Sequence, residues 1–318
     1  MIQISSDINR AATILQEGGL VAIPTETVYG LAGNIFNESA IKKIFKTKQR
    51  PLFNPLIVHV KSREYVNEVA EYIPPKATQL ADAFWPGPLT LVLKKKPIIP
   101  DLITAGKDTV ALRMPDHRLT QKLLNVLDFP VAAPSANPFG RISPTKAEHV
   151  ANYFADELEM VLDGGPCQSG IESTIIGFDG DNPILYRLGS ISKEDIEAVV
   201  GPVESITKND TTPDAPGMLS RHYAPTTPTV LSNNVLATVM KHQGKRIGVL
   251  FFKTLFTHDR IAVAQVLSPD GSEKEAASNL YAALHDLDKM YLDVIIAERL
   301  PDHGLGASIN DRLLRATK

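Results

Sequence analysis

The sequence lacks several features that mark secreted, membrane and disulfide-stabilised proteins. One cysteine, Cys167, stands among its 318 residues, which excludes an internal disulfide and fits a reducing compartment. No run of about 18 apolar residues occurs, and the first residues, 1–10, are polar. We therefore expect neither a membrane span nor a signal peptide, no association with membranes, and a cytoplasmic location.

Motifs that bind nucleotides or metals are also missing. Neither Gly-x-x-x-x-Gly-Lys-Ser/Thr nor Gly-x-Gly-x-x-Gly occurs in a strand-to-helix context, so neither common glycine-rich phosphate cradle is present. The eight histidines do not cluster at metal-ligand spacings, and we expect no metal bound by protein side chains. The net charge of −3 argues against a protein that coats nucleic acid over a wide surface.

What is present is the composition of a soluble globular α/β protein. Hydrophobic residues make up 43% and charged residues 22% of the chain, and its length suggests two domains. Apolar runs typical of strands alternate with segments of helical periodicity. We predict a catalytic domain over 1–200, a proline-rich linker over 201–229, and a smaller Rossmann-like α/β domain over 230–318. The last predicted helix of the small domain covers 308–316.

Polar side chains follow two predicted buried strands at the point where each strand ends. One strand leads into Thr27, and another leads into Ser135 and Asn137. Because ligand sites in open α/β sheets lie at the carboxyl ends of strands, a binding site is expected here. Turns whose hydroxyls cap the next helix explain the same pattern equally well. For Ser143 and Thr145, which precede a predicted helix, we expect such a capping role besides any contact with a ligand.

A stretch without acidic residues, 39–63, concentrates positive charge close to these strand ends. Its basic residues are Lys42, Lys43, Lys46, Lys48, Arg50, Lys61 and Arg63. Most charge runs are solvated helix faces, and that interpretation stays open. We favour an anionic ligand because Pro51 ends the predicted helix while the run continues, and because apolar residues already supply the buried stripe of that helix.

The polar groups expected at strand ends together describe a polyanion site. They are Thr27, Lys48, Arg50, Asn54, His59, Arg113, Ser135, Asn137, Ser143, Ser173 and Arg187. Arginine donates two parallel hydrogen bonds to carboxylate and phosphate oxygens, and hydroxyl and amide groups complete phosphate or ribose contacts. Carboxylates are sparse in this set, so we predict no acid–base dyad and catalysis by positioning and charge.

Six motifs in order, at compatible spacings, resemble the YrdC-like threonylcarbamoyl-AMP synthases. They are Pro24-Thr-Glu-Thr-Val-Tyr-Gly-Leu31, Lys48-x-Arg50-Pro51 with Asn54-Pro-Leu56, Phe84-Trp-Pro-Gly-Pro-Leu-Thr90, Val110-Ala-Leu-Arg-x-Pro115, Ala133-Pro-Ser-Ala-Asn137 and Glu172-Ser-Thr174. The linker sequence Arg221-His-Tyr-Ala-Pro225 and the tail Gly304-x-Gly-x-x-Ile-x-Asp-Arg312 are similar to the long, two-domain form. The resemblance implies a YrdC-like twisted mixed sheet with helices, followed by the smaller domain.

The resemblance also implies an activity. The family joins L-threonine, bicarbonate or CO2, and ATP into threonylcarbamoyl-adenylate and releases pyrophosphate, with Mg2+ expected on the ATP. The product goes to a separate tRNA threonylcarbamoyltransferase complex, which modifies the adenosine 3′ of the anticodon. The residues implied for L-threonine are Thr27, His59, Arg113, the Ala133 backbone and Ser173. Those implied for ATP are Arg50, Asn54, Thr109, Ser135, Asn137, Ser143, Arg187 and Tyr223, with Lys48 and Arg50 as the catalytic charges.

The linker departs from the family pattern, and other functions remain open. Leu219 and Ser220 stand where the family often has lysine and tyrosine, which puts any contact from these two positions in doubt. We expect the linker to close over the site as a lid. The rival function is a double-stranded RNA or tRNA binding module of the same fold, and the basic run leaves weak RNA binding open. A carbamoyltransferase of the hydrogenase-maturation type would bring zinc-finger and acylphosphatase modules that are not found here.

Overall fold

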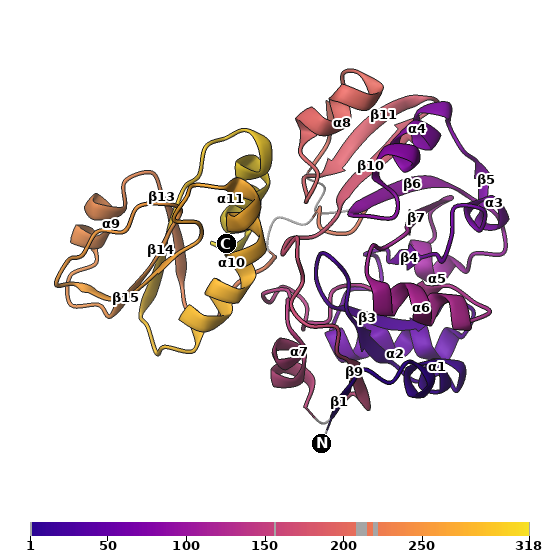
Figure 1. Ribbon diagram of the computed structural model, residues 1–318, viewed down its shortest axis with the longest axis horizontal. Coiled ribbons are helices and arrows are strands. Elements are labelled where there is room, and N and C mark those ends of the chain that lie inside the picture. The colour runs from indigo at the N-terminus through magenta and orange to yellow at the C-terminus, as the bar shows by residue number, and fades with distance from the viewer. Residues whose placement is uncertain (1, 156, 208–214, 219–221, 318) are drawn as a thin grey trace.

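The computed structural model describes residues 2–155, 157–207, 215–218 and 222–317. Within them, twelve strands form one mixed sheet and four strands form a second, fully parallel sheet. The two sheets belong to two lobes that lie side by side (Figure 1). This is the expected arrangement of a YrdC-like mixed sheet with a smaller α/β unit.

The large sheet is built from short strands far apart in the sequence. Along the sheet, the order is β1 (Gln3–Ser5), β9 (Met160–Leu162), β2 (Val21–Ile23), β3 (Gly30–Asn34), β8 (Val131–Ala132), β4 (Ile57–His59), β7 (Thr109–Arg113), β6 (Leu89–Lys95), β10 (Thr174–Asp179), β11 (Asn182–Arg187) and β12 (Glu204–Ser205). A further strand, β5 (Ala70–Tyr72), pairs with β6. The helices of this lobe are α1 (Ile8–Gln16), α2 (Glu38–Lys48), α3 (Val66–Val69), α4 (Pro75–Phe84), α5 (Asp101–Thr104), α6 (Arg118–Val126), α7 (Ala147–Phe154) and α8 (Lys193–Val200).

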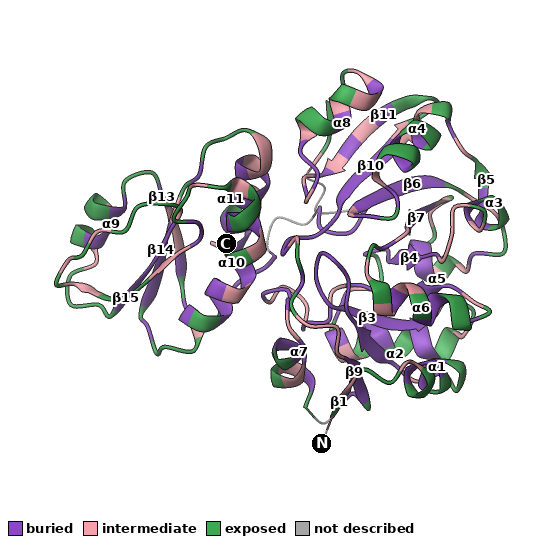
Figure 2. Ribbon diagram, viewed as in Figure 1, coloured by how far each residue is buried: buried purple, intermediate pink, exposed green. Residues whose placement is uncertain are grey.

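The small lobe has a helix on one face of its sheet and two on the other. Its strand order is β13 (Thr229–Ser232), β16 (Val294–Glu298), β14 (Ile247–Phe251) and β15 (Ile261–Val266). Helix α9 (Val235–Lys241) packs on the outer face, while α10 (Glu273–Asp288) and α11 (Gly304–Ala316) lie on the face toward the large lobe (Figure 1). The central strands are buried on both sides, as Figure 2 shows, which is typical of parallel sheets.

Side-chain caps fix where several helices begin, and one expected cap is wrong. Asp7 and Asn37 accept hydrogen bonds from the first turns of α1 and α2. By contrast, α7 begins after Lys146 without a side-chain cap. The Ser143 hydroxyl donates instead to Glu172, and the Thr145 hydroxyl is buried and has no partner among the described residues. A capping hydroxyl would have to accept from a backbone N–H of the first turn, whereas the Ser143 hydroxyl is oriented by the hydrogen bond that it donates to the carboxylate.

The two lobes share one hydrophobic cluster. Val28, Ile142 and Ile171 of the large lobe pack with Leu280 and Tyr281 of α10, and other apolar side chains of α10 and α11 belong to the same cluster. The lobes are therefore packed together rather than merely tethered. None of the described helices is both long enough and apolar enough to cross a membrane.

A close backbone contact across this interface predicts a sensitive position. Gly170 has φ +71°, and a Cβ built there would lie 2.4 Å from the Ala277 carbonyl oxygen of α10. Gly180 has φ +56° and open space around its Cβ position. A side chain at position 180 would therefore cause backbone strain but no steric clash. We expect Gly180→Ala to lower the free energy of unfolding by about 1 kcal/mol, and Gly170→Ala to lower it clearly more. Urea denaturation of both variants measures the difference, and equal losses would show that the contact is not tight.

Candidate active site

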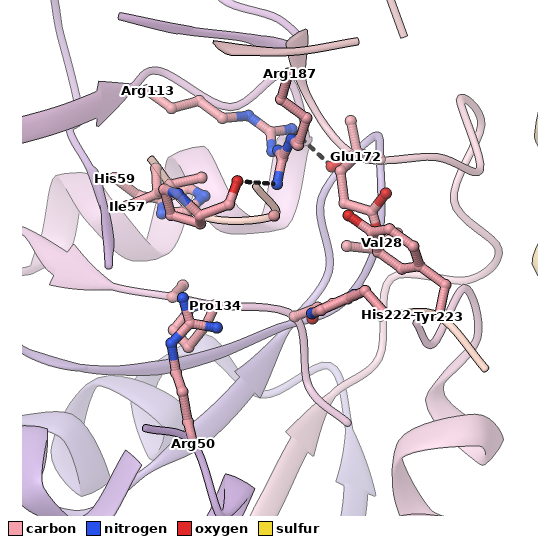
Figure 3. A pocket seen from close by; sticks show the side chains of 15 residues that line it. Val28, Arg50, Ile57, His59, Arg113, Pro134, Glu172, Arg187, His222 and Tyr223 are labelled. Atoms are coloured by element: carbon pink, nitrogen blue, oxygen red, sulfur yellow. Dashed lines mark hydrogen bonds between the residues drawn. The ribbon is translucent and has the colours of Figure 1, made fainter. Parts of the chain in front are cut away.

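A cavity opens on one face of the large sheet, next to the linker. Its space, including the mouth open to solvent, is about 520 Å³. The residues around it are Thr27, Val28, Arg50, Ile57, His59, Arg113, Ala133, Pro134, Ser135, Glu172, Arg187, Pro216, Gly217, His222 and Tyr223. Figure 3 shows Arg113 and Arg187 entering from one side, Arg50 from the opposite side, and Glu172 with Tyr223 at one end. Three guanidinium groups thus converge on one space.

The register of two parallel strands places the central side chains. His59 of β4 pairs with Arg113 of β7, and Ile57 pairs with Ala111 two residues earlier. Because alternate residues of a strand point to the same face, all four lie on the face that bears the cavity. Thr109, two residues before Ala111, lies on this face as well. Strand periodicity therefore places Ile57 and Ala111 next to each other on this face, followed by the pair His59 and Arg113.

Arg113 is held by a carboxylate behind it. Its Nη2 donates to Glu26 Oε1 over 2.6 Å and to Thr27 Oγ1 over 2.9 Å. The other carboxylate oxygen of Glu26 accepts from the Asp116 backbone. The Arg113 Nε has no partner in the described structure. One edge of the guanidinium is thus fixed, and a donor remains for a ligand.

The other two arginines are held mainly by neutral oxygens. Arg50 donates to the Asn54 side chain over 2.6 Å and to the Pro55 carbonyl over 2.8 Å. Arg187 donates to the Ser173 carbonyl over 2.8 Å and to the Pro216 carbonyl over 3.3 Å. Neutral acceptors orient these groups without cancelling their charge. Both arginines therefore remain available to bind an anion.

Burial, assisted by nearby positive charge, lowers the pKa of two histidines of the cavity and keeps them neutral. Burial, assisted by the charge of Arg113, lowers the pKa of His59 to about 3. Burial also lowers the pKa of His222 to about 3, and the charges of Arg50 and Arg187 act in the same direction. Burial lowers the pKa of Arg50 to about 9, which leaves its guanidinium protonated at pH 7. At neutral pH the positive charge of the cavity comes from arginine, while the imidazoles act as neutral hydrogen-bonding groups.

Eight residues predicted from the sequence line the cavity: Thr27, Arg50, His59, Arg113, Ala133, Ser135, Arg187 and Tyr223. Six others do not line it: Lys48, Asn54, Thr109, Asn137, Ser143 and Ser173. Most of these six support the lining from behind. Asn54 and Ser173 accept hydrogen bonds from arginines, and Ser143 donates to Glu172. Their predicted contacts with substrates stay predictions.

Lys48 and Asn137 hold the loop that carries Ser135. The Lys48 ammonium donates to the carbonyl oxygens of Ser135 and Asn137, each over 2.5 Å. The Asn137 amide donates to the carbonyls of Pro138 and Arg141. Burial, with the charge of Arg50 nearby, lowers the pKa of Lys48 well below its usual value. In this arrangement Lys48 contacts the protein backbone and is not part of the cavity wall.

Two carboxylates of the site were not among the predicted site residues. Glu172 lines the cavity, and Glu26 holds Arg113. Both stand inside motifs that carried the family resemblance, next to the predicted residues Ser173 and Thr27. Their position in the motifs was the available signal. Because carboxylates do not bind anions, neither Glu26 nor Glu172 is expected in an anion site from its residue type alone.

The fold and cavity together define an α/β protein with a cavity lined by three buried arginines, beside a packed second lobe. Comparisons with known proteins specify it further. Residues 13–189 match the family model described as "Telomere recombination", and residues 191–317 match "Threonylcarbamoyl-AMP synthase, C-terminal domain". The chain belongs to the threonylcarbamoyl-AMP synthase family, in its two-domain form.

Two relatives and one solved structure are similar to the chain over nearly its whole length. The chain is 41% identical to threonylcarbamoyl-AMP synthase of Pyrococcus abyssi over 98% of this chain and 94% of the relative. It is 42% identical to the protein of the same name from Bacillus subtilis, over 97% and 92%. The crystal structure of P. abyssi Sua5 complexed with L-threonine superimposes with a TM-score of 0.92 at 40% identity, covering 100% of this chain and 97% of that one. Escherichia coli YciO, at 22% identity and a TM-score of 0.53, shares the fold of the large lobe.

The contacts of Lys48 predict that its replacement lowers the stability of the fold. Lys48→Met removes the donor of two buried carbonyl oxygens, so we expect a loss of about 2–4 kcal/mol in the free energy of unfolding. Lys46→Met, at an exposed position of the same helix, is the matched control and should change little. Urea denaturation of both variants is the measurement. A Lys48→Met protein as stable as the control would show that these hydrogen bonds do not support the loop.

Proposed function

We propose that this protein is an L-threonylcarbamoyladenylate synthase that joins L-threonine, bicarbonate or CO2, and ATP, and releases pyrophosphate. One observation carries the proposal. Four buried polar atoms without a partner in the described structure, His59 Nδ1, Arg113 Nε, His222 Nδ1 and Tyr223 Oη, belong to residues around the same cavity. Buried polar atoms are rarely left unpaired, so such a group indicates a place prepared for a polar ligand.

The region around Arg113 fits an amino acid. The free Nε of Arg113 is a suitable donor for a substrate carboxylate, and the neutral imidazole of His59 is suited to a hydroxyl or amine. Thr27, the Ala133 backbone and Ser173 complete the proposed L-threonine contacts. The complex of the P. abyssi relative with L-threonine supports this assignment.

The region between Arg50, Arg187 and Tyr223 is our proposed ATP site. We assign Asn54, Thr109, Ser135, Asn137 and Ser143 to the same ligand. The threonine amine takes up CO2 to form a carbamate, whose oxygen attacks the α-phosphorus in line as pyrophosphate leaves. Arg50 and Arg187, with Lys48 behind the Ser135 loop, stabilise the charge that develops on the phosphate oxygens.

We propose that Mg2+ enters with ATP as part of the substrate. Glu172, the carboxylate of the cavity wall, is already bound by Ser143, Tyr281 and Arg312. The described residues contain no group of three or more His, Cys, Asp or Glu that could hold a metal ion. The residues present therefore suit a metal that is carried by triphosphate oxygens.

The linker is our proposed lid. Ala215 and Met218 are buried against Ile57, Ala111 and Ile175, on the sheet face that also carries Thr109. A nucleotide that reaches Thr109 would have to share this face with the linker. We propose that the linker shifts when ATP binds and excludes water from the reactive adenylate. Leu219 and Ser220 lie outside the described residues.

We place the reaction in the cytoplasm and propose that the product passes to a tRNA threonylcarbamoyltransferase complex. RNA binding by the chain itself has less support. Lys48 and Arg50 of the basic run are buried, and Lys42 pairs with Glu38 over 2.5 Å. The remaining basic side chains allow at most weak, salt-sensitive contact with RNA.

Pyrophosphate release tests the proposed function directly. We expect release from ATP to require L-threonine and Mg2+, to increase with bicarbonate, and to stop when EDTA removes the metal. Mass spectrometry should identify threonylcarbamoyl-adenylate as the second product. If no combination of substrates released pyrophosphate while double-stranded RNA bound tightly, the RNA-binding alternative would replace the synthase.

The buried charge of Arg50 at the proposed phosphate site predicts that this residue contributes to the rate of pyrophosphate release. Arg50→Ala removes a buried guanidinium from the proposed phosphate site, so we expect kcat at saturating ATP to fall by about 100-fold or more. Arg10→Ala is the control, because Arg10 is exposed on α1. Steady-state pyrophosphate release measures both variants. Near-normal turnover of Arg50→Ala would contradict the proposed role of Arg50.

A further inference from the structure

The tail motif that ends in Arg312 has no role in the reaction described so far. Arg312 lies on α11 of the small lobe and is 1% exposed, which makes it one of the largest fully buried side chains. A buried arginine requires acceptors on every side that faces protein. The acceptors of Arg312 show what it does.

Arg312 pairs with two carboxylates: the neighbouring Asp311, which also pairs with Arg315, and Glu172 in the cavity wall of the other lobe. Arg312 Nε donates to Glu172 Oε2 over 2.8 Å, and the Tyr281 hydroxyl of α10 donates to the same oxygen over 2.9 Å. Ser143 donates to the other oxygen of Glu172 over 2.6 Å. Arg312 Nη2 donates to the Leu188 carbonyl, directly after β11. Two helices of the small lobe therefore hold one carboxylate of the site.

Arg312 also supports the linker tyrosine. Its guanidinium carbon lies 5.0 Å from the ring centroid of Tyr223, within the range of a cation–π contact. The rings of His222 and Tyr281 also lie against it, with centroids 4.1 Å and 5.8 Å away. Glu172 and Tyr223 both line the cavity, while Arg312 itself does not. Arg312 thus contacts two wall residues from behind.

We propose that Arg312 is a positioning residue for ATP: it neutralises the Glu172 carboxylate in the wall of an anion site and fixes the ring of Tyr223 at the cavity. The proposal rests on the proposed function, because it assigns the polyphosphate ligand to this cavity. It gives the small lobe a direct part in substrate affinity. Arg312 acts through Glu172 and Tyr223, without touching the substrate.

The electrostatic reason is the negative charge of Glu172. Burial raises the pKa of this carboxyl group, but the charges of Arg312 and Arg187 and the hydrogen bond from Ser143 together lower the pKa to about 2. Glu172 is therefore ionised at pH 7. An uncompensated carboxylate would repel ATP, whereas the Glu172–Arg312 pair presents little net charge to the cavity.

Loss of Arg312 should introduce a pH dependence. The titratable and charged groups that face Glu172 are Tyr281 from α10, Arg312 and the linker residues His222 and Tyr223, together with Arg187 from β11. His222 stays neutral near pH 7. Without Arg312, burial raises the pKa of Glu172 above its wild-type value. The carboxyl group is then protonated at low pH and becomes a repulsive charge as pH rises.

The test compares Arg312→Gln, the double variant Glu172→Gln/Arg312→Gln and the control Arg299→Gln. Arg299 forms an ion pair with Asp302 at the surface of the same lobe. Calorimetry with Mg2+–ATP from pH 6 to 9 gives Kd, and pyrophosphate release gives kcat and KM for ATP and L-threonine. We expect Arg312→Gln to weaken Mg2+–ATP binding by about tenfold, increasingly so at higher pH, with a smaller change in KM for L-threonine. The double variant should recover most of the affinity and lose the pH trend, while the control matches wild type.

Several outcomes would overturn the proposal. An unchanged Kd for Arg312→Gln is one, and an equal loss in the double variant is another, because removal of both charges should relieve the repulsion. If Arg312→Gln does not fold, Tyr281→Phe removes one donor to Glu172 and keeps the ring. It should show a smaller weakening with the same pH trend, and an unchanged Kd would count against the proposal. A wild-type protein that binds Mg2+–ATP but makes no adenylate would disprove the synthase, while the Kd comparison still decides the role of Arg312.

Discussion

Burial of positive charge around a single cavity is the constraint on which this structure depends. Arg50, Arg113 and Arg187 are each less than a tenth exposed, yet each must stay charged to bind an anion. A buried charge without hydrogen bonds is too costly to persist, so every guanidinium needs acceptors on its protein side. Some of those acceptors, such as Thr27 and Pro216, line the cavity, and others, such as Asn54 and Ser173, lie behind its lining. This requirement explains why many polar residues that look like ligand-binding groups in the sequence support the lining instead.

The kind of acceptor decides what each arginine can do. Glu26 fixes Arg113 with a carboxylate, which cancels part of its charge and suits a singly charged substrate carboxylate. Arg50 and Arg187 are held mostly by amide and carbonyl oxygens, which leave their full charge for a polyphosphate. Arg113 thus differs from Arg50 and Arg187 in how much of its charge is cancelled, although all three line one cavity. The difference matches the proposed division between L-threonine and ATP.

Sequence patterns could predict the parts of this protein that depend on local chemistry. The strand ends led to Thr27, His59 and Arg113, because alternation and strand termini leave clear marks. The start of α11 was predicted four residues late, at 308, since glycines at its first turn do not resemble a helix. Gly306 is needed there, because a Cβ would lie 2.2 Å from the Pro301 carbonyl. Contacts such as Arg312 with Glu172 join residues 140 positions apart, and no local pattern contains them.

The Glu172–Arg312 pair also bears on why the two lobes are packed together. Buried ion pairs contribute little to stability compared with well-packed apolar residues of similar volume, so stability alone does not account for a charged pair at this interface. The shared cluster of Val28, Ile171 and Leu280 already supplies apolar packing. The pair instead fixes the orientation of the side chains around Glu172. Glu172, held by three donors, fixes the Ser143 hydroxyl, and the Arg312 guanidinium carbon stays 5.0 Å from the ring centroid of Tyr223. The interface therefore sets the shape and charge of the cavity wall, and separation of the lobes would expose an uncompensated charge at the site.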